Sequence, residues 1–202
     1  MSTKQTTSTW TAWFLWVTAG EFAGFLAPAV TGALTSSAPL LVLAGITEGA
    51  VLGAAQWLVL RRAVRGLEPG DWIGVTALAA GFAWAVAMLA VHYGEPLRTL
   101  PLGVLLPLAT VAGAGVLLSI GIGQWLVLRH HVDRAFTWVW ANAVAWCGGL
   151  IVFTAFTTPL WQPGQQVALI AGIGAVGGLL MAATMAAITG FALVRLLPRH
   201  LT

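Results

Sequence analysis

Long apolar runs without charge, separated by short polar segments, dominate this chain and predict membrane-spanning helices. Glu21 interrupts the first run and Glu48 the second, and the next two runs carry no charged residue. Each run is long enough to match the ~20 residues that a helix needs to cross the apolar layer of a bilayer. These four runs cover residues 10–34, 38–60, 72–91 and 99–128.

The last uncharged run, residues 135–194, is too long for a single span. Residues 157–164 within it are relatively polar and contain two prolines and a glycine, a composition typical of a turn. The run therefore divides into two spans, which brings the expected number to six. Glu21 in the middle of the first span, together with the length of that span, favours a retained helix over a signal peptide. We expect an all-α polytopic membrane protein with one transmembrane domain over residues 1–202.

The composition agrees with this pattern. Apolar residues make up 59% of the chain and charged residues only 7%, whereas a soluble domain is about a quarter charged. A soluble globular enzyme and a disordered chain are therefore excluded. The single Cys147 has no second cysteine to pair with, which excludes a disulfide scaffold.

The positions of the basic residues predict the orientation of the chain in the membrane. Only Arg98 falls on one side of the expected spans, and the other basic residues fall on the opposite side. By the positive-inside rule, that second side is cytoplasmic and both termini are cytoplasmic, in a plasma (inner) membrane. Because these cations flank apolar spans and form no patch on an exposed domain, no nucleic-acid partner is expected. The residues on the cytoplasmic side are Lys4, Arg61, Arg62, Arg65, Arg129, Arg134, Arg195 and Arg199.

An internal repeat organises the chain. The hexapeptide Gln-Trp-Leu-Val-Leu-Arg occurs at residues 56–61 and again at 124–129. Alignment on Arg195 gives a degraded third copy, with Gly190 at the position of the glutamine. All three copies run in the same direction across the membrane, so the repeat is parallel. We expect three helical hairpins in a pseudo-threefold arrangement, with repeat units of about 8–66, 67–134 and 135–199.

The depth of each repeated residue indicates its role. Trp57 and Trp125 lie close to the expected cytoplasmic interface, where amphipathic rings anchor helices, and the alternative is that they stack on a bound hydrophobic ligand. The arginines of the three copies, Arg61, Arg129 and Arg195, are expected to anchor the same interface. Five further tryptophans complete an expected inner aromatic belt: Trp10, Trp13, Trp72, Trp138 and Trp140.

Small and polar residues mark one face of the second span. Gly45, Gly49 and Gly53 are spaced by four residues, and Gln56 follows on the same face. Small residues at this spacing allow close packing of helices, and a glutamine can hydrogen-bond across the contact. The sharper alternative is that polar side chains line a path along the pseudo-threefold axis. The candidates for packing or pore lining are Gln56, Gln124, Thr76 and Asn142.

Glu21 and Glu48 are the residues that packing explains least well. Glu21 lies 11 residues beyond Trp10 and Glu48 lies 10 beyond Ala38. Both are therefore ~15 Å deep, near the middle of the apolar layer. No Lys, Arg or His lies in any expected span, so each carboxylate must be hydrated, protonated or bound to a cation. When Trp13 is aligned with the equivalent tryptophans of the other repeats, apolar residues fall at the position of Glu21: Ala80 and Trp146.

The neighbours of Glu21 favour a small polar site. Thr18, Glu21, Gly24 and Pro28 share one face of the first span. Pro28 has no N–H to donate, which leaves the carbonyl of Gly24 free. The sequence therefore predicts a proton-binding or cation-binding site at Glu21, Glu48, Thr18 and Gly24. Whether the two carboxylates share one site is left open by the sequence.

No catalytic signature, metal-ligand spacing or phosphate loop is present, and an enzyme is not expected. No histidine lies at membrane depth to hold a haem, no lysine lies in a span to hold retinal, and no cofactor is expected. The leading hypothesis is a transport-type protein with a buried carboxylate site. The alternative is a non-catalytic membrane subunit or scaffold that binds partner helices, lipid or pigment, as a homo-oligomer or within a larger complex. A weaker third hypothesis is an intramembrane enzyme that uses the carboxyl pair.

Overall fold

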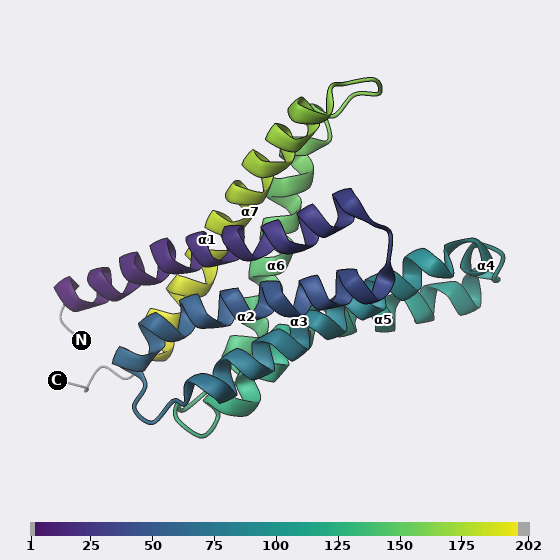
Figure 1. Cartoon of the computed structure of the whole chain (residues 1–202). Helices are drawn as coiled ribbons and strands as arrows, with labels where there is room; N and C mark the ends of the chain where they lie inside the picture. Colours follow the sequence, from purple (N-terminus) through teal and green to yellow (C-terminus); the bar gives the residue numbers. More distant parts are fainter. Residues whose placement is uncertain (1–2, 198–202) are drawn as a thin grey trace.

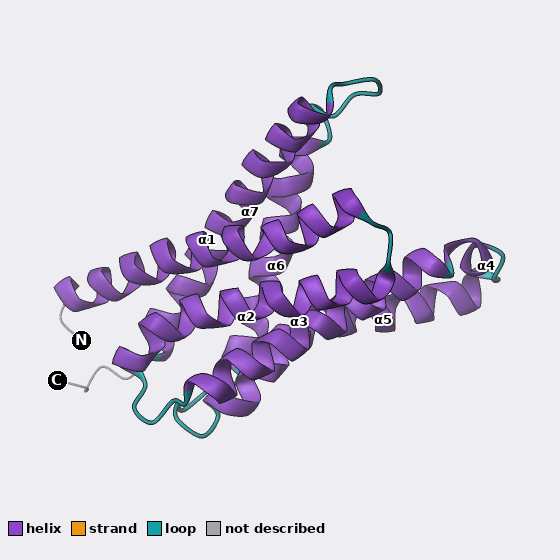
Figure 2. Ribbon diagram, in the orientation of Figure 1, coloured by secondary structure: helices purple, strands orange, loops and turns teal. Residues whose placement is uncertain are grey.

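The computed structural model describes residues 3–197, with side chains from Thr7 onward, and every regular element in this part of the chain is a helix (Figure 2). Six helices are long and apolar enough to cross a membrane, and the short α4 is the exception. The predicted all-α membrane architecture with six spans is confirmed. The helices are α1 (Thr3–Leu34), α2 (Ala38–Ala63), α3 (Pro69–His92), α4 (Gly94–Arg98), α5 (Leu102–Leu128), α6 (Thr137–Thr157) and α7 (Val167–Leu196).

The long uncharged run divides where the turn composition predicts. Helix α6 ends at Thr157 and α7 begins at Val167. Gly164 in the intervening loop has a φ of +80°, a conformation that glycine adopts without steric cost. The sequence did not indicate α4, a single short turn of helix between the third and fourth spans.

The six long helices form a closed ring in chain order. Each packs against the next, and α7 returns to pack against α1. The ring is built from the hairpins α1/α2, α3/α5 and α6/α7, and the loop of α6/α7 lies apart from the other two loops while the opposite ends of the hairpins converge (Figure 1). The pseudo-threefold relation between the repeats stays a prediction.

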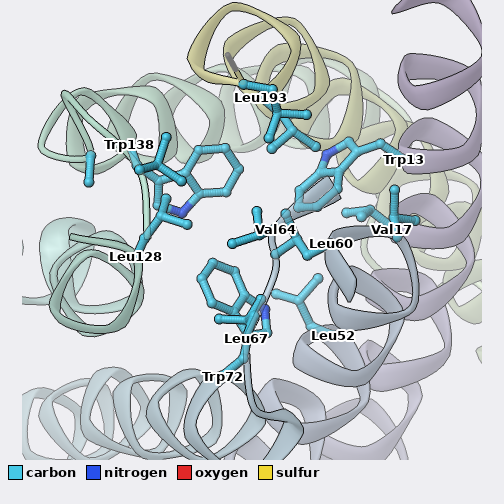
Figure 3. Close-up of a cluster of buried hydrophobic side chains, with 14 of the residues drawn as sticks. Trp13, Val17, Leu52, Leu60, Val64, Leu67, Trp72, Leu128, Trp138 and Leu193 are labelled. Atoms are coloured by element: carbon cyan, nitrogen blue, oxygen red, sulfur yellow. The ribbon is translucent and has the colours of Figure 1, made fainter. Parts of the chain in front are cut away.

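The hydrophobic core lies where the three hairpins converge. Trp13 of α1, Trp72 of α3 and Trp138 of α6 are almost completely buried and point toward one another across the cluster (Figure 3). Leucines and valines from the adjacent helices and loops fill the space around the three indoles. In contrast, the outer half of α5 is exposed, including Leu102 and Val111, so this surface would face lipid.

Close packing ties α2 to α3. A Cβ atom at Gly49 would lie 2.7 Å from the carbonyl oxygen of Thr76, and one at Gly53 would lie 3.1 Å from the Cα of Ile73. A Cβ atom at Gly45 would overlap the ring of Trp84. The three glycines therefore allow the two helices to approach at the level of their backbones.

The basic residues are distributed between the two ends of the bundle. The start of α1, the end of α7 and the loops α2–α3 and α5–α6 lie together at the converging end (Figure 1). These segments carry the arginines of the three repeat copies, so this end is called the Arg-rich end below. Arg98 lies in α4 at the opposite end and forms an exposed ion pair with Glu95 at 2.9 Å. The side chain of Lys4 and residues Arg199 and His200 lie outside the part that the structure describes.

Candidate functional site

The two intramembrane carboxylates occupy facing positions on α1 and α2. Glu21 is 4% exposed and Glu48 is 9% exposed. A Cβ atom at Gly24 would lie 2.9 Å from the backbone oxygen of Glu48, so the two helices are in close contact here. Glu21 lies one helical turn from Gly24 on α1. The structure thus places the segments of α1 and α2 that carry Glu21 and Glu48 in contact.

Glu48 has one specific partner. Its Oε2 accepts a hydrogen bond of 2.8 Å from Nε1 of Trp84 on α3. Sequence analysis missed Trp84, which lies far from both interfaces in an uncharged span. That position was the available signal, because a tryptophan within an apolar span needs an acceptor for its indole N–H.

Glu21 has an oxygen without a protein partner. Neither Glu21 Oε2 nor the hydroxyl oxygen of Thr18, one turn away on α1, has a hydrogen-bond partner in the protein. The carbonyl of Gly24 adds a further acceptor, because Pro28 lies inside α1 and cannot donate to it. This set of oxygen atoms suits a proton or a hard cation and offers no soft ligand.

A second polar cluster joins the hairpins near the core. Gln124 Nε2 donates to Gln56 Oε1 at 2.6 Å and to the hydroxyl of Thr76 at 3.0 Å. Trp72 Nε1 donates to Gln56 Oε1 at 3.2 Å, and Trp138 Nε1 donates to Gln124 Oε1 at 2.8 Å. Both glutamines are buried, so the contacts of these side chains are with protein.

Thr76 and Asn142 occupy corresponding places in this cluster. Each lies one turn beyond a core tryptophan, and its side chain donates to the backbone oxygen of that tryptophan. Gly53 packs against Thr76, and Gly121 packs against Asn142. The four candidates for packing or pore lining are thus hydrogen-bonded inside the bundle.

Thr189 of α7 completes the series of indole hydrogen bonds. Trp13 Nε1 donates to the Thr189 hydroxyl at 2.9 Å, as the other two core tryptophans donate to Gln56 and Gln124. Alignment on Arg195 had placed the neighbouring Gly190 at the position of the glutamine. Alignment on the buried leucine is more accurate, because Leu193 is buried as Leu60 and Leu128 are. This alignment places Thr189 at the position of the two glutamines.

The expected inner aromatic belt is wrong for three of its members. Trp13, Trp72 and Trp138 are at most 1% exposed, so they do not lie at the lipid interface. The physical reason is that each indole N–H finds an acceptor inside the bundle. Sequence position did not indicate the direction in which these side chains point.

The two repeated Trp–Arg pairs have equivalent contacts. The Arg61 guanidinium lies 5.1 Å from the ring centroid of Trp57, and the Arg129 guanidinium lies 5.4 Å from that of Trp125. A cation over an indole ring is attracted by its π electrons. Arg195 in the last turn of α7 is exposed. The motif therefore keeps a paired ring and cation at the Arg-rich end of both α2 and α5.

Replacing Gln124 with leucine is expected to destabilise the protein by about 2 kcal/mol. The change removes three hydrogen bonds of about 0.6 kcal/mol each, the average for membrane proteins, and leaves the Trp138 indole unpaired. Unfolding in increasing dodecyl sulfate measures the effect. Thr110→Val on the same helix is the control, because that hydroxyl is exposed and bonds only to its own helix. Equal stability of the two variants would show that the network contributes nothing.

Comparison of this chain with protein families, with characterised proteins and with solved structures gives no match. The function has to be inferred from the geometry of the two carboxylates and their neighbours.

Proposed function

We propose that this protein is a transport-type integral membrane protein that binds a proton or a cation at Glu21 and Glu48. The observation that carries the proposal is the burial of both carboxylates on contacting helices, with one oxygen of Glu21 lacking any protein partner. An ionised carboxylate at this depth costs ~2.5 kcal/mol or more. Two such groups on facing helices therefore favour a bound proton or cation that neutralises them.

The other hairpins support a functional role for this site. Ala80 and Trp146 correspond to Glu21 in the aligned repeats, and Ala80 packs tightly against Gly49. An apolar residue at this position is thus compatible with a helical hairpin of the same design. Glu21 is therefore better explained by binding than by a requirement of packing.

Thr18, Gly24 and Trp84 complete the proposed site. The Thr18 hydroxyl and the free Gly24 carbonyl supply neutral oxygens near Glu21. The Trp84 indole donates to Glu48 and orients its carboxylate. Two carboxylates are neutralised by two protons, by one proton and one monovalent cation, or by cations that carry two positive charges in total.

Release of the cation requires one part of the bundle to move relative to another. The glycines of α2 fix this helix to α3 at the backbone level, which ties the first two hairpins together. Hairpin α6/α7 is tied to α5 in the same way, because a Cβ atom at Gly121 would lie 3.0 Å from the backbone oxygen of Val139. The glycines of α7 that face α1 meet side-chain rings instead, such as Phe25 at Gly178. We infer that the ring of helices opens between α1 and α7.

The proposal places the Arg-rich end in the cytoplasm, in accordance with the positive-inside rule. Both termini are then cytoplasmic, and the membrane is the plasma (inner) membrane. No catalytic step is assigned to the carboxyl pair. The surrounding lipid bilayer is the only partner that the proposal requires.

Occupancy of the site can be tested with dicyclohexylcarbodiimide, which reacts with protonated carboxyl groups in apolar surroundings. We expect mass spectrometry to locate the adduct on Glu21 or Glu48, and a transported cation such as Na⁺ to slow its formation. Glu95 is the internal control, because it is exposed and ion-paired with Arg98. Absence of an adduct on both buried glutamates, at any pH at which the protein stays folded, would contradict the proposed site.

A further inference from the structure

Three buried polar side-chain atoms in the described part of the chain have no hydrogen-bond partner in the protein, and all three belong to α1. They are Trp10 Nε1, Thr18 Oγ1 and Glu21 Oε2. Glu21 as a whole is only 4% exposed. Buried polar groups in native proteins nearly always have a partner, either protein or ordered water. Three unpaired atoms along one helix therefore require a common explanation.

The face of α1 that carries these atoms packs against α7. The Trp10 ring contacts Phe191, with their centroids 5.2 Å apart, and the Phe25 ring lies 3.3 Å from the Cβ position of Gly178. Thr18 lies about two helical turns from Trp10 and two turns from Phe25, so it shares their face. Thr18 is thus enclosed between two points of contact with α7.

Helix α7 offers few polar groups along this face. Thr189 is engaged already, since it accepts from Trp13 and donates to the carbonyl oxygen of Met185. The other residues on the stripe are small and apolar, and neither donate nor accept through their side chains. They are spaced by four and all buried: Gly178, Ala182, Ala186 and Gly190.

We propose that the α1–α7 interface holds a row of water molecules that connects Glu21 to the Arg-rich end of the bundle. A buried water molecule makes ~3 hydrogen bonds to otherwise unpaired polar groups. Thr18 lies one turn from Glu21 toward the Arg-rich end, and Trp10 lies two turns further in the same direction. The three unpaired atoms mark successive positions along this row.

The row gives the carboxylate pair access from one side of the membrane. On the other side of the pair, Oε2 of Glu48 accepts a hydrogen bond from the Trp84 indole of α3. The assignment of this row as the route of the cation rests on the proposed function. The presence of water does not, and it can be measured separately.

The test uses cysteine variants in a Cys147→Ala background and silver ion, a small cation that reacts with thiols in water. Thr18→Cys places a thiol in the row, and Ala19→Cys places one at nearly the same depth on the exposed side of α1. In membrane vesicles, silver added at the Arg-rich end is expected to block Thr18→Cys at least ~10-fold faster than Ala19→Cys, because lipid excludes ions. Subsequent labelling of the unfolded protein with a maleimide quantifies the remaining thiol.

Further variants make the result decisive. Asp133→Cys, in the exposed α5–α6 loop, reports which vesicles present the Arg-rich end. Ala186→Cys tests the same interface from α7, in case Thr18→Cys does not fold. Equal rates for the interface and lipid-facing thiols, or faster reaction from the opposite end, would overturn the proposal. Silver access without any cation flux would support the water row and contradict the transport function.

Discussion

Replacing Glu21 or Glu48 with glutamine is expected to abolish cation flux through this protein in proteoliposomes. Glutamine keeps the shape of glutamate and can hydrogen-bond, but it cannot exchange a proton or neutralise a cation. Because both carboxylates are buried on facing helices, loss of either one leaves a site of different charge. A pH-sensitive dye trapped in the vesicles, with an imposed proton or Na⁺ gradient, measures the flux. Both variants should match protein-free vesicles.

The control for charge is Glu95→Gln. Glu95 lies in α4, is exposed and pairs only with Arg98, so its loss should leave the flux at the wild-type rate. Gel filtration and helical circular dichroism establish that the buried variants keep the fold. Equal flux in the wild type and in the Glu21→Gln/Glu48→Gln double variant would refute transport through this site.

The fold was predictable because charge is so rare in this chain. Charged residues mark the ends of the spans, since an ion in the apolar layer is costly. The segment of Thr157 to Gly164 was recognisable by its prolines and glycine and lies where α6 and α7 separate. The number of spans and their approximate ends could therefore be predicted from the sequence.

The direction in which a side chain points was much harder to predict. In a soluble helix an apolar stripe marks the core, but here both the lipid side and the core side are apolar. Trp13 and Trp16 illustrate the difficulty, because the first is fully buried and the second is 52% exposed. Only polar residues indicate which side of a helix faces the bundle interior, and Gln56 and Gln124 accordingly point into the bundle.

Contacts between distant segments could not be predicted from one sequence. The hydrogen bond from Trp84 to Glu48 joins residues 36 positions apart, and that from Trp13 to Thr189 joins residues 176 apart. Both depend on the order of helices in the ring, which the spacing of residues within one helix does not determine. The sequence therefore predicted the two carboxylates of the candidate site, whereas the contact of Trp84 with Glu48 became apparent only from the fold.

Gly49 is the position on α2 where an added methyl group is expected to be most damaging to the packing against α3. A Cβ atom there would lie 2.7 Å from the carbonyl oxygen of Thr76 and 2.9 Å from the Cα of Ala77. These are backbone atoms of α3, which cannot turn aside as a flexible side chain can. The two helices must separate to admit the methyl group.

Gly49→Ala is therefore expected to lower the free energy of unfolding by about 1–3 kcal/mol, the usual cost of overpacking. Gly74→Ala on α3 is the matched control, because a Cβ atom at Gly74 meets nothing within 4 Å. The control should be neutral or slightly stabilising, because alanine restricts the unfolded chain. Unfolding in dodecyl sulfate compares the stability of the two variants.

Since Gly49 is adjacent to Glu48, separation of the helices should also weaken the hydrogen bond from Trp84. A change in tryptophan fluorescence in Gly49→Ala but not in Gly74→Ala, which disappears when Trp84 is also replaced with phenylalanine, would link this contact to the carboxylate site. Equal stability of Gly49→Ala and Gly74→Ala would show that α2 and α3 are not held together at the backbone level.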